Sequence, residues 1–217
     1  MGIEAGRGYR TEVGTALAAA MSVTGISKAS AAVVSGSGFS VVAGDYVYMG
    51  QVDGMVELSY VVARVAASPT PTASAFTLEG IDSTNFGTWS ASAGVQKINT
   101  WSTLAQATSV DFGAGQVESL DATTLLDVAR QSQAGLISLA DVSINLFTDY
   151  SASVQSAIDT AAYAGTILPF RFTKASGHKR LLAGIPSTVG ESVQVNQLIT
   201  GSLTVIRRSN RDVKYTT

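Results

Sequence analysis

The chain of 217 residues contains no cysteine and only one histidine. Without cysteine it can form no disulfide, no thiolate nucleophile and no sulfur-ligated zinc site. The single histidine, His178, lies in the string SGHKR beside two basic residues. We expect it to be an exposed turn residue, because a catalytic base or a metal centre needs partner groups that this string does not offer. No metal ion or cofactor is therefore expected.

Charged residues are also scarce, at 14% of the chain, whereas 46% of the residues are hydrophobic and 21 are glycine. So few charges suit a protein that hides much of its surface in an assembly. Long apolar runs are missing too, since none approaches the roughly eighteen residues of a membrane-spanning helix. Gly14 and Thr15 interrupt the apolar stretch from Val13 to Met21, so we expect neither a secretory signal nor a membrane span.

The signatures of an enzyme are weak. The string Gly113-Ala114-Gly115 is not followed by Gly-Lys-Ser/Thr and opens no helix, so we interpret it as a turn and not as a phosphate site. Asp121 and Asp127 could act as a carboxylate pair on a cell-wall sugar, but no aromatic sugar platform lies near them in the sequence. We predict that the protein is not an enzyme.

The few charges are unevenly distributed. Residues 100–165 contain seven acids and one base, a net charge of −6, and residues 166–217 contain eight bases and two acids, a net charge of +6. Two interpretations are open. The segments form complementary surfaces on neighbouring copies of the chain, or they pair with each other within one fold.

Short β-type runs alternate with turn residues along most of the chain. Residues 152–164 are the one expected helix, with Val154, Ile158 and Ala161 on an apolar stripe, Ser151 or Ser153 as N-cap and Gly165 at the end. Many strands with one helix predict a mainly β (α+β) fold, an antiparallel β-sandwich or barrel flanked by one α-helix. The expected strands cover 9–13, 21–26, 31–35, 46–51, 56–65, 75–78, 98–103, 107–112, 117–121, 140–149, 166–173, 180–185, 189–195 and 198–208.

The segment 117–150 organises the rest of the chain. Residues 117–121 have the period-two alternation of a half-buried strand, and in 140–149 Val142, Ile144 and Leu146 alternate with polar residues. We expect the eighteen residues between these strands to form a polar loop, which is longer than a hairpin turn requires. Loops of that length are usually functional or disordered.

The same segment resembles the major tail tube proteins of long-tailed phages. Those proteins have a strand that ends in a pattern like ESLDATTLLD, then a loop, then an entry like QAGLISLADVSINLF into the next strand. The resemblance covers residues 1–20 loosely and 99–217 more fully. The matching residues are Glu118, Asp121, Thr123, Gly135, Leu136, Asp141, Val142 and Ile144.

Residues 21–98 resemble a second family, a repeat of phage structural proteins that is compared with the first catalytic-cysteine half-domain of ubiquitin-activating enzymes. The sequence departs from the repeat after Gly54-Met55, where VELSYVV replaces the usual Leu-Asn-Gly. Without cysteine the segment carries no enzyme. We interpret it as a small β module inserted between an N-terminal arm, 1–20, and the tail tube domain, 99–217. The matching residues are Gly38, Phe39, Gly44, Asp45, Val47, Gly54, Met55, Phe76, Leu78, Gly80, Asp82, Ser83, Thr84, Phe86 and Thr88.

The tail tube resemblance implies a structural virion protein. Its copies would form hexameric rings, and the stacked rings would enclose a lumen that holds the tape-measure protein and conducts phage DNA during genome ejection. A tail terminator and tail-tip proteins would be further partners. The protein would be part of the virion tail, and of the host cytoplasm during assembly. The alternative is a phage surface module that binds a receptor or a carbohydrate through residues 21–98.

Two groups of residues follow from this interpretation as assembly sites. The polar face of 140–149 and the strand before the loop are expected to line an acidic lumen, because a wall of the same sign as DNA keeps it from sticking. The loop from Thr123 to Ser138 is expected to reach the neighbouring ring. The lumen candidates are Glu118, Asp141, Asn145 and Asp149, and the ring-stacking candidates are Asp127, Arg130 and Gln133.

Overall fold

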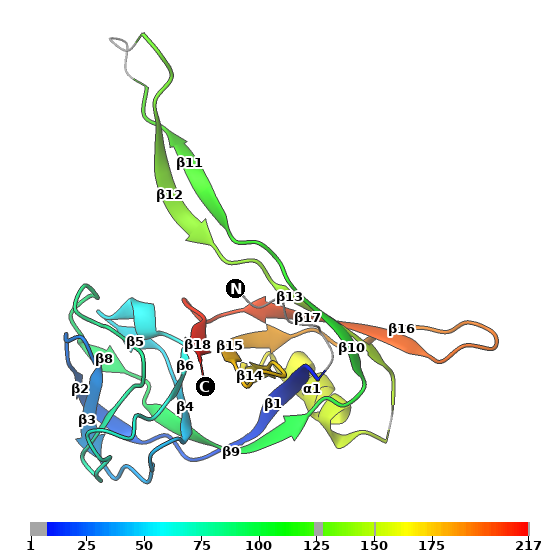
Figure 1. The fold of residues 1–217 in the computed structure, drawn as a ribbon, viewed down its shortest axis with the longest axis horizontal. Coiled ribbons are helices and arrows are strands. Elements are labelled where there is room, and N and C mark those ends of the chain that lie inside the picture. The colour runs from blue at the N-terminus through cyan, green and yellow to red at the C-terminus, as the bar shows by residue number, and fades with distance from the viewer. Residues whose placement is uncertain (1–7, 124–127, 150, 217) are drawn as a thin grey trace.

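A computed structural model describes residues 8–123, 128–149 and 151–216. Within these residues the chain is mainly antiparallel β-sheet with one α-helix, a β-sandwich in which two long hairpins leave the body (Figure 1). The expected fold class is confirmed.

The main sheet of the described chain has eleven strands, and all of its strand pairings are antiparallel. Two strands lie off its main path, β16 (Gly190–Ser192) beside β17 and β18 (Val213–Tyr215) beside β15. The hydrogen-bonded order of the others is β10 (Ala107–Phe112), β13 (Val142–Phe147), β17 (Thr200–Arg207), β15 (Lys179–Pro186), β14 (Leu168–Thr173), β1 (Arg10–Leu17), β9 (Val95–Thr103), β4 (Tyr46–Met49) and β6 (Val62–Arg64).

Helix α1 (Ser153–Ala164) packs on β15 and β1. Ile158 and Ala161 are buried, as the apolar stripe predicts, and Gly165 ends the helix with a left-handed φ of 63°. The predicted serine N-cap is wrong. Ala152 takes that position without a side-chain cap, because the Ser151 hydroxyl donates to the Asp149 carboxylate instead (2.6 Å).

Two hydrophobic clusters fill the body, and β15 separates them. Leu182 points into a cluster with Phe170, Phe172, α1 and the buried face of β13, whereas its neighbours Leu181 and Ala183 point into the second cluster. The alternation of side chains along a strand sends these neighbours to opposite faces. Apart from Leu181, Ala183, Val213 and Tyr215, the buried members of the second cluster all come from residues 21–98.

Residues 21–98 contribute β4 and β6 to the main sheet and form two small sheets of their own. These contain β2 (Ser22–Ile26), β3 (Val33–Ser37) and β7 (Ala75–Thr77), and β5 (Val52–Asp53) with β8 (Ala91–Ser92). The expected single strand 56–65 is wrong. The 3-10 turn η1 (Val56–Leu58) and the left-handed Tyr60 (φ 60°) interrupt it before β6 begins.

The expected loop after residue 121 is also wrong in part, because its second half is a strand. β12 (Ser132–Ser138) pairs with β11 (Gln116–Asp121) as a two-stranded ribbon that projects from the body (Figure 1). All of β11 is exposed, so it is not the half-buried strand that its alternation suggested. Both faces of the ribbon are in contact with solvent. Because neither face is buried, its sequence does not need to alternate between apolar and polar residues.

Candidate assembly surfaces

The polar face of β13 lies on the outside of the sandwich. Val142, Ile144 and Leu146 are fully buried, while Ser143 and Asn145 point away from the core, as their parity predicts. Phe147 shares the polar side and is 37% exposed.

Neighbouring strands extend this polar face on both sides of β13. Asn145 lies between Ser109 of β10 and Ser202 of β17, and its amide donates to the Ser109 hydroxyl (2.9 Å). Ser143 lies opposite the exposed carboxylate of Asp111. The face therefore presents hydroxyl and amide groups with one acid, and we call it the polar sheet face (Ser109, Asp111, Ser143, Asn145 and Ser202).

Both edges of this part of the sheet lack a partner among the described strands. β10 is the first strand of the sheet order, and β16 pairs only with the N-terminal half of β17, because β15 pairs with the other half. Unpaired backbone N–H and C=O groups at such edges are a template for another chain. The four strands β10, β13, β17 and β16 alternate in direction. Edge strands of two identically oriented copies would therefore meet antiparallel.

The ribbon β11–β12 exposes apolar side chains as well as charges. Val117, Leu120 and Ile137 are about half exposed or more. The exposed Asp121 pairs with Arg130 across the ribbon (3.0 Å). Its pKa lies below the ordinary range because the Thr123 hydroxyl and N–H donate to it, and Arg130 adds a smaller effect. The ribbon offers a long exposed surface with polar and apolar parts.

A second projection continues β16 and β17 beyond their pairing. We call residues 193–199 the arm tip. Its side chains from Val193 to Leu198 are exposed, and Figure 1 shows it leaving the body on the side away from residues 21–98. The predicted strand 189–195 is shorter in the structure, where only residues 190–192 are strand and Val193 and Val195 are exposed.

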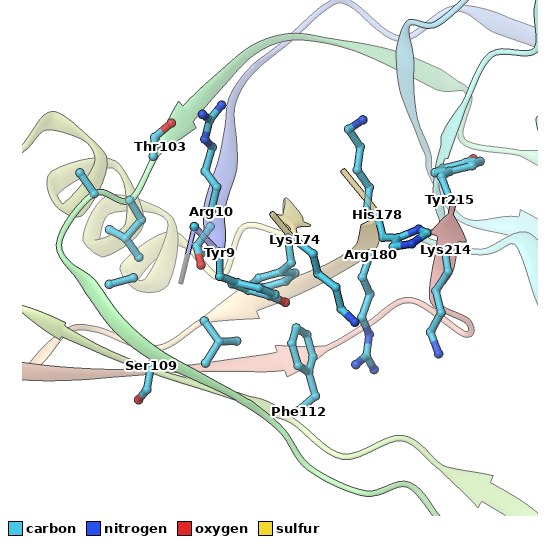
Figure 2. Close-up of a pocket in the computed structure, with 18 of the residues that line it drawn as sticks. Tyr9, Arg10, Thr103, Ser109, Phe112, Lys174, His178, Arg180, Lys214 and Tyr215 are labelled. Carbon is cyan, nitrogen blue, oxygen red and sulfur yellow. The ribbon is translucent and has the colours of Figure 1, made fainter. Parts of the chain in front are cut away.

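A cleft with a volume of about 1080 Å³ runs along the free edge of β10. We call it the β10 cleft. Figure 2 shows Tyr9, Lys174 and Phe112 close together, with Arg180, His178 and Lys214 beside them. The residues that line it include no acid. Burial raises the pKa of Tyr9 to about 12, and the charge of Arg180 opposes that shift.

Arg180 in the wall of this cleft belongs to a charge cluster with Asp212 and Arg207. Arg180 donates to Asp212 through Nε (2.7 Å) and lies over the Phe112 ring, 3.9 Å from its centroid. Arg207 is the second cation on Asp212, and burial lowers its pKa while Asp212 acts in the opposite direction. The Arg207 side chain is therefore buried. Its place on β17 turns the side chain inward.

A family model described as "Phage tail tube protein, TTP" matches residues 53–211, most of the chain. The chain belongs to the phage tail tube proteins. No curated protein matches the sequence. One solved structure, described as the 6-fold symmetrised cryo-EM structure of the anti-feeding prophage baseplate, is similar at a TM-score of 0.42 and 8% identity, over 55% of this chain and 86% of that chain.

The family match identifies this tail tube protein as a structural protein of the phage tail, which confirms the first resemblance. The match begins inside residues 21–98, the segment predicted to be an insertion. No metal-binding cluster of three or more histidine or acidic side chains occurs in the described parts of the chain. In the same parts, no helix has the length and apolarity needed to cross a membrane.

The four predicted lumen residues of the tail tube protein lie in different places. Asn145 is on the polar sheet face, and Asp141 stands just before β13, where its carboxylate accepts the Arg207 N–H (3.2 Å). Asp149 lies in the turn into α1, where donation from Ser151 keeps its pKa low. Glu118 is on the ribbon and not on the sheet.

The predicted stacking residues lie on the ribbon where the structure describes them. Gln133 is opposite Leu120 in the β11–β12 pairing, and Arg130 already has a partner in Asp121. Asp127 lies outside the described residues.

His178 was predicted to be an exposed turn residue, and this was wrong. It is half-buried in the wall of the β10 cleft, and its Nδ1 is buried without a hydrogen-bond partner among the described atoms. The cause is β18, a strand that we did not predict, because it pairs with β15 next to the turn.

The sequence left open whether the acidic segment 100–165 and the basic segment 166–217 pair within one chain or between copies. The ion pairs of the basic residues decide little between these two interpretations. Arg171 pairs with Glu12 (2.7 Å), while Arg180 and Arg207 pair with Asp212. Neither of these two acids belongs to the acidic segment 100–165. Two acids of segment 100–165 do accept hydrogen bonds from segment 166–217: Asp141 from the Arg207 N–H (3.2 Å) and Asp159 from the Val189 N–H (3.0 Å).

Proposed function

We propose that this chain is the major tube subunit of a phage tail, in which six copies form a ring and stacked rings enclose a channel for DNA. The observation that carries the proposal is the four-stranded polar sheet face with an unpaired edge at each end. Side-by-side copies pair the β16 edge of one with the β10 edge of the next. The resulting closed barrel leaves no exposed edge.

The polar sheet face then lines the channel. This face has hydroxyl and amide groups and one acid, Asp111. A second exposed acid, Asp141, stands just before β13. Repeated around a ring, these acids repel the DNA phosphates, and the effect reaches about 8–10 Å at physiological salt. The tape-measure protein occupies the same channel before DNA passes. The tail terminator and tail-tip proteins meet the two ends of the tube.

The β11–β12 ribbon is the stacking element in this proposal. It projects from the connection between β10 and β13, two strands of the channel wall, and it exposes apolar side chains that a single copy does not cover (Figure 1). A contact with the next ring buries them. Asp127, Arg130 and Gln133 belong to this contact.

Residues 21–98 form a module on the outside of the tube. Their separate hydrophobic cluster and their place at the far end of the body from the arm tip support this (Figure 1). A peptide tag inserted at Thr70, in an exposed loop, is expected to bind antibody on intact tubes. Tubes that hide the tag would place the module in the wall.

Electron microscopy of the purified protein tests the proposal. Rings or tubes are expected at high protein concentration or after seeding with tail fragments. In the virion, the protein is expected in the tail. A species that stays monomeric at every concentration, salt and seeding condition contradicts the proposal. It would favour the alternative, a surface module that binds a receptor or a carbohydrate.

A further inference from the structure

The arm tip exposes three apolar side chains on a defined turn. Val193 is 70% exposed, Val195 88% and Leu198 70%. Asn196 adopts a left-handed conformation (φ 60°), and the Gln197 N–H donates to the Gln194 carbonyl (3.4 Å), so the turn is already formed. A clustered apolar surface of this kind marks a contact site. A preformed turn also loses little entropy when it binds.

The β10 cleft has the size and lining to receive such a turn. At about 1080 Å³ it matches the upper end of the roughly 300–1,000 Å³ range of small-molecule pockets. Tyr9, Leu104, Val110 and Phe112 give it apolar surface. Its charges are basic, and Glu191 is the only charged residue between 189 and 199, so the two surfaces do not repel each other.

We propose that the arm tip of one copy occupies the β10 cleft of the next copy in the ring. The inference rests on the ring of the proposed function and names the contact that closes it. The tip and the cleft lie at opposite edges of the same sheet, so each copy offers one of each. A contact between two different surfaces closes into a ring when the rotation between copies allows it.

The strand register supports this placement. Ser192 lies opposite Thr200, which lies opposite Phe147, and the neighbouring Leu146 lies opposite Ala107. The arm tip therefore continues past the level at which β10 begins. At that level Leu104 and Ala105 line the cleft. If β16 pairs with β10 of the next copy, the arm tip lies beside the end of the cleft that Leu104 and Ala105 line.

Cross-linking tests the contact directly, because the natural chain contains no cysteine. Ala105→Cys and Val195→Cys change two exposed apolar side chains, which form no hydrogen bonds. After oxidation of assembled rings, the double variant is expected to give a ladder of covalent oligomers on a non-reducing denaturing gel. A mixture of the two single variants is expected to stop at dimers. Val42→Cys with Val195→Cys is the matched control and is expected to give no ladder.

The outcomes separate this inference from the proposed function. Rings that form without a ladder from Ala105→Cys and Val195→Cys overturn the inference and leave the proposed function standing. A protein that forms no ring under any condition overturns both. A ladder from the Val42 control that equals the ladder of the test pair also contradicts the inference, because the contact would then be unspecific.

Substitution of a charged residue gives a second test that needs no cysteine. Val195→Asp is expected to raise the protein concentration needed for ring formation by roughly tenfold or more, the effect of losing a central apolar contact. Val42→Asp changes a valine that is 62% exposed at the other end of the body, and it is expected to leave that concentration unchanged. Equal effects of the two substitutions contradict the proposal.

Discussion

Arg207 and Asp212 form an ion pair of 3.1 Å in which both side chains are at least nine-tenths buried. Arg180 binds the same carboxylate, so two guanidinium groups depend on one acid. The Nε and Nη2 atoms of Arg207 are buried without a hydrogen-bond partner among the described atoms. The cluster joins β17, β15 and the turn before β18, and its counter-charge is Asp212.

The first prediction concerns this cluster. Asp212→Asn is expected to lower the free energy of unfolding by about 3–5 kcal/mol, because it leaves buried cations without a counter-charge. Arg207→Met is expected to cost less, since Arg180 still pairs with Asp212 and the apolar side chain fills the space. Urea unfolding measures both. Asp111→Asn, on the exposed sheet face, serves as control and is expected to change stability by less than about 0.5 kcal/mol.

The second prediction concerns stability at alkaline pH. Burial raises the pKa of Tyr48 from 10.0 to about 12, with Tyr60 adding to the shift and Arg208 opposing it. The folded state therefore holds the phenol proton more tightly than the unfolded state. This contribution is complete below pH 10 and is lost as the pH rises towards about 12.

Between pH 10 and pH 12, the urea concentration at the unfolding midpoint is expected to fall less for Tyr48→Phe than for the natural protein. Part of the fall remains, because Tyr9 is also raised to about 12. The exposed Tyr163 allows the matched control Tyr163→Phe, which is expected to leave the slope unchanged. Parallel slopes for the natural protein and Tyr48→Phe contradict the prediction.

The third prediction concerns stacking. Replacing residues 117–137 by a short Gly/Ser turn is expected to permit rings but abolish tubes, because the ribbon is the proposed contact between rings. Electron microscopy distinguishes the two assemblies. The double variant Asp121→Ala and Arg130→Ala keeps the ribbon and removes only an exposed ion pair, so tubes are expected to persist. Long tubes from the shortened protein would show that stacking lies elsewhere.

The fourth prediction concerns the channel. Ser143 is exposed at the centre of the polar sheet face, and its hydroxyl makes no hydrogen bond to the described residues, so its substitution is expected to leave the sheet intact. Ser143→Lys is expected to leave tubes intact but slow DNA ejection from assembled particles, because cations around the channel attract phosphate. Ser143→Glu, of opposite charge, is expected to eject DNA at the natural rate. Equal rates for both variants would place this face outside the channel.

Local pattern was sufficient for many of the elements. The alternation of Val142, Ile144 and Leu146 predicted the buried face of β13, and the apolar stripe with Gly165 predicted α1 and its end. These features depend on the period of side chains along one strand or helix, which the sequence contains in full. The tail tube family was also recognisable from the residues around this strand, and the family match confirms it.

Only the tertiary structure decided which side chains those elements meet. The ribbon strands β11 and β12 have no buried face, so no hydrophobic period indicated β12. Conversely, Val193 and Val195 of the arm tip alternate with polar residues, as in a strand with one buried face, but both are exposed. The chain turns at the arm tip, and no described segment packs against these valines. The burial of Arg207 and His178 depends on β18, which arrives from the end of the chain and pairs with β15. The hydrophobic period is a property of one segment and can be seen in the sequence. Burial depends on contacts between segments that are far apart in the sequence. Burial decides whether the ribbon, the arm tip, Arg207 and His178 are exposed.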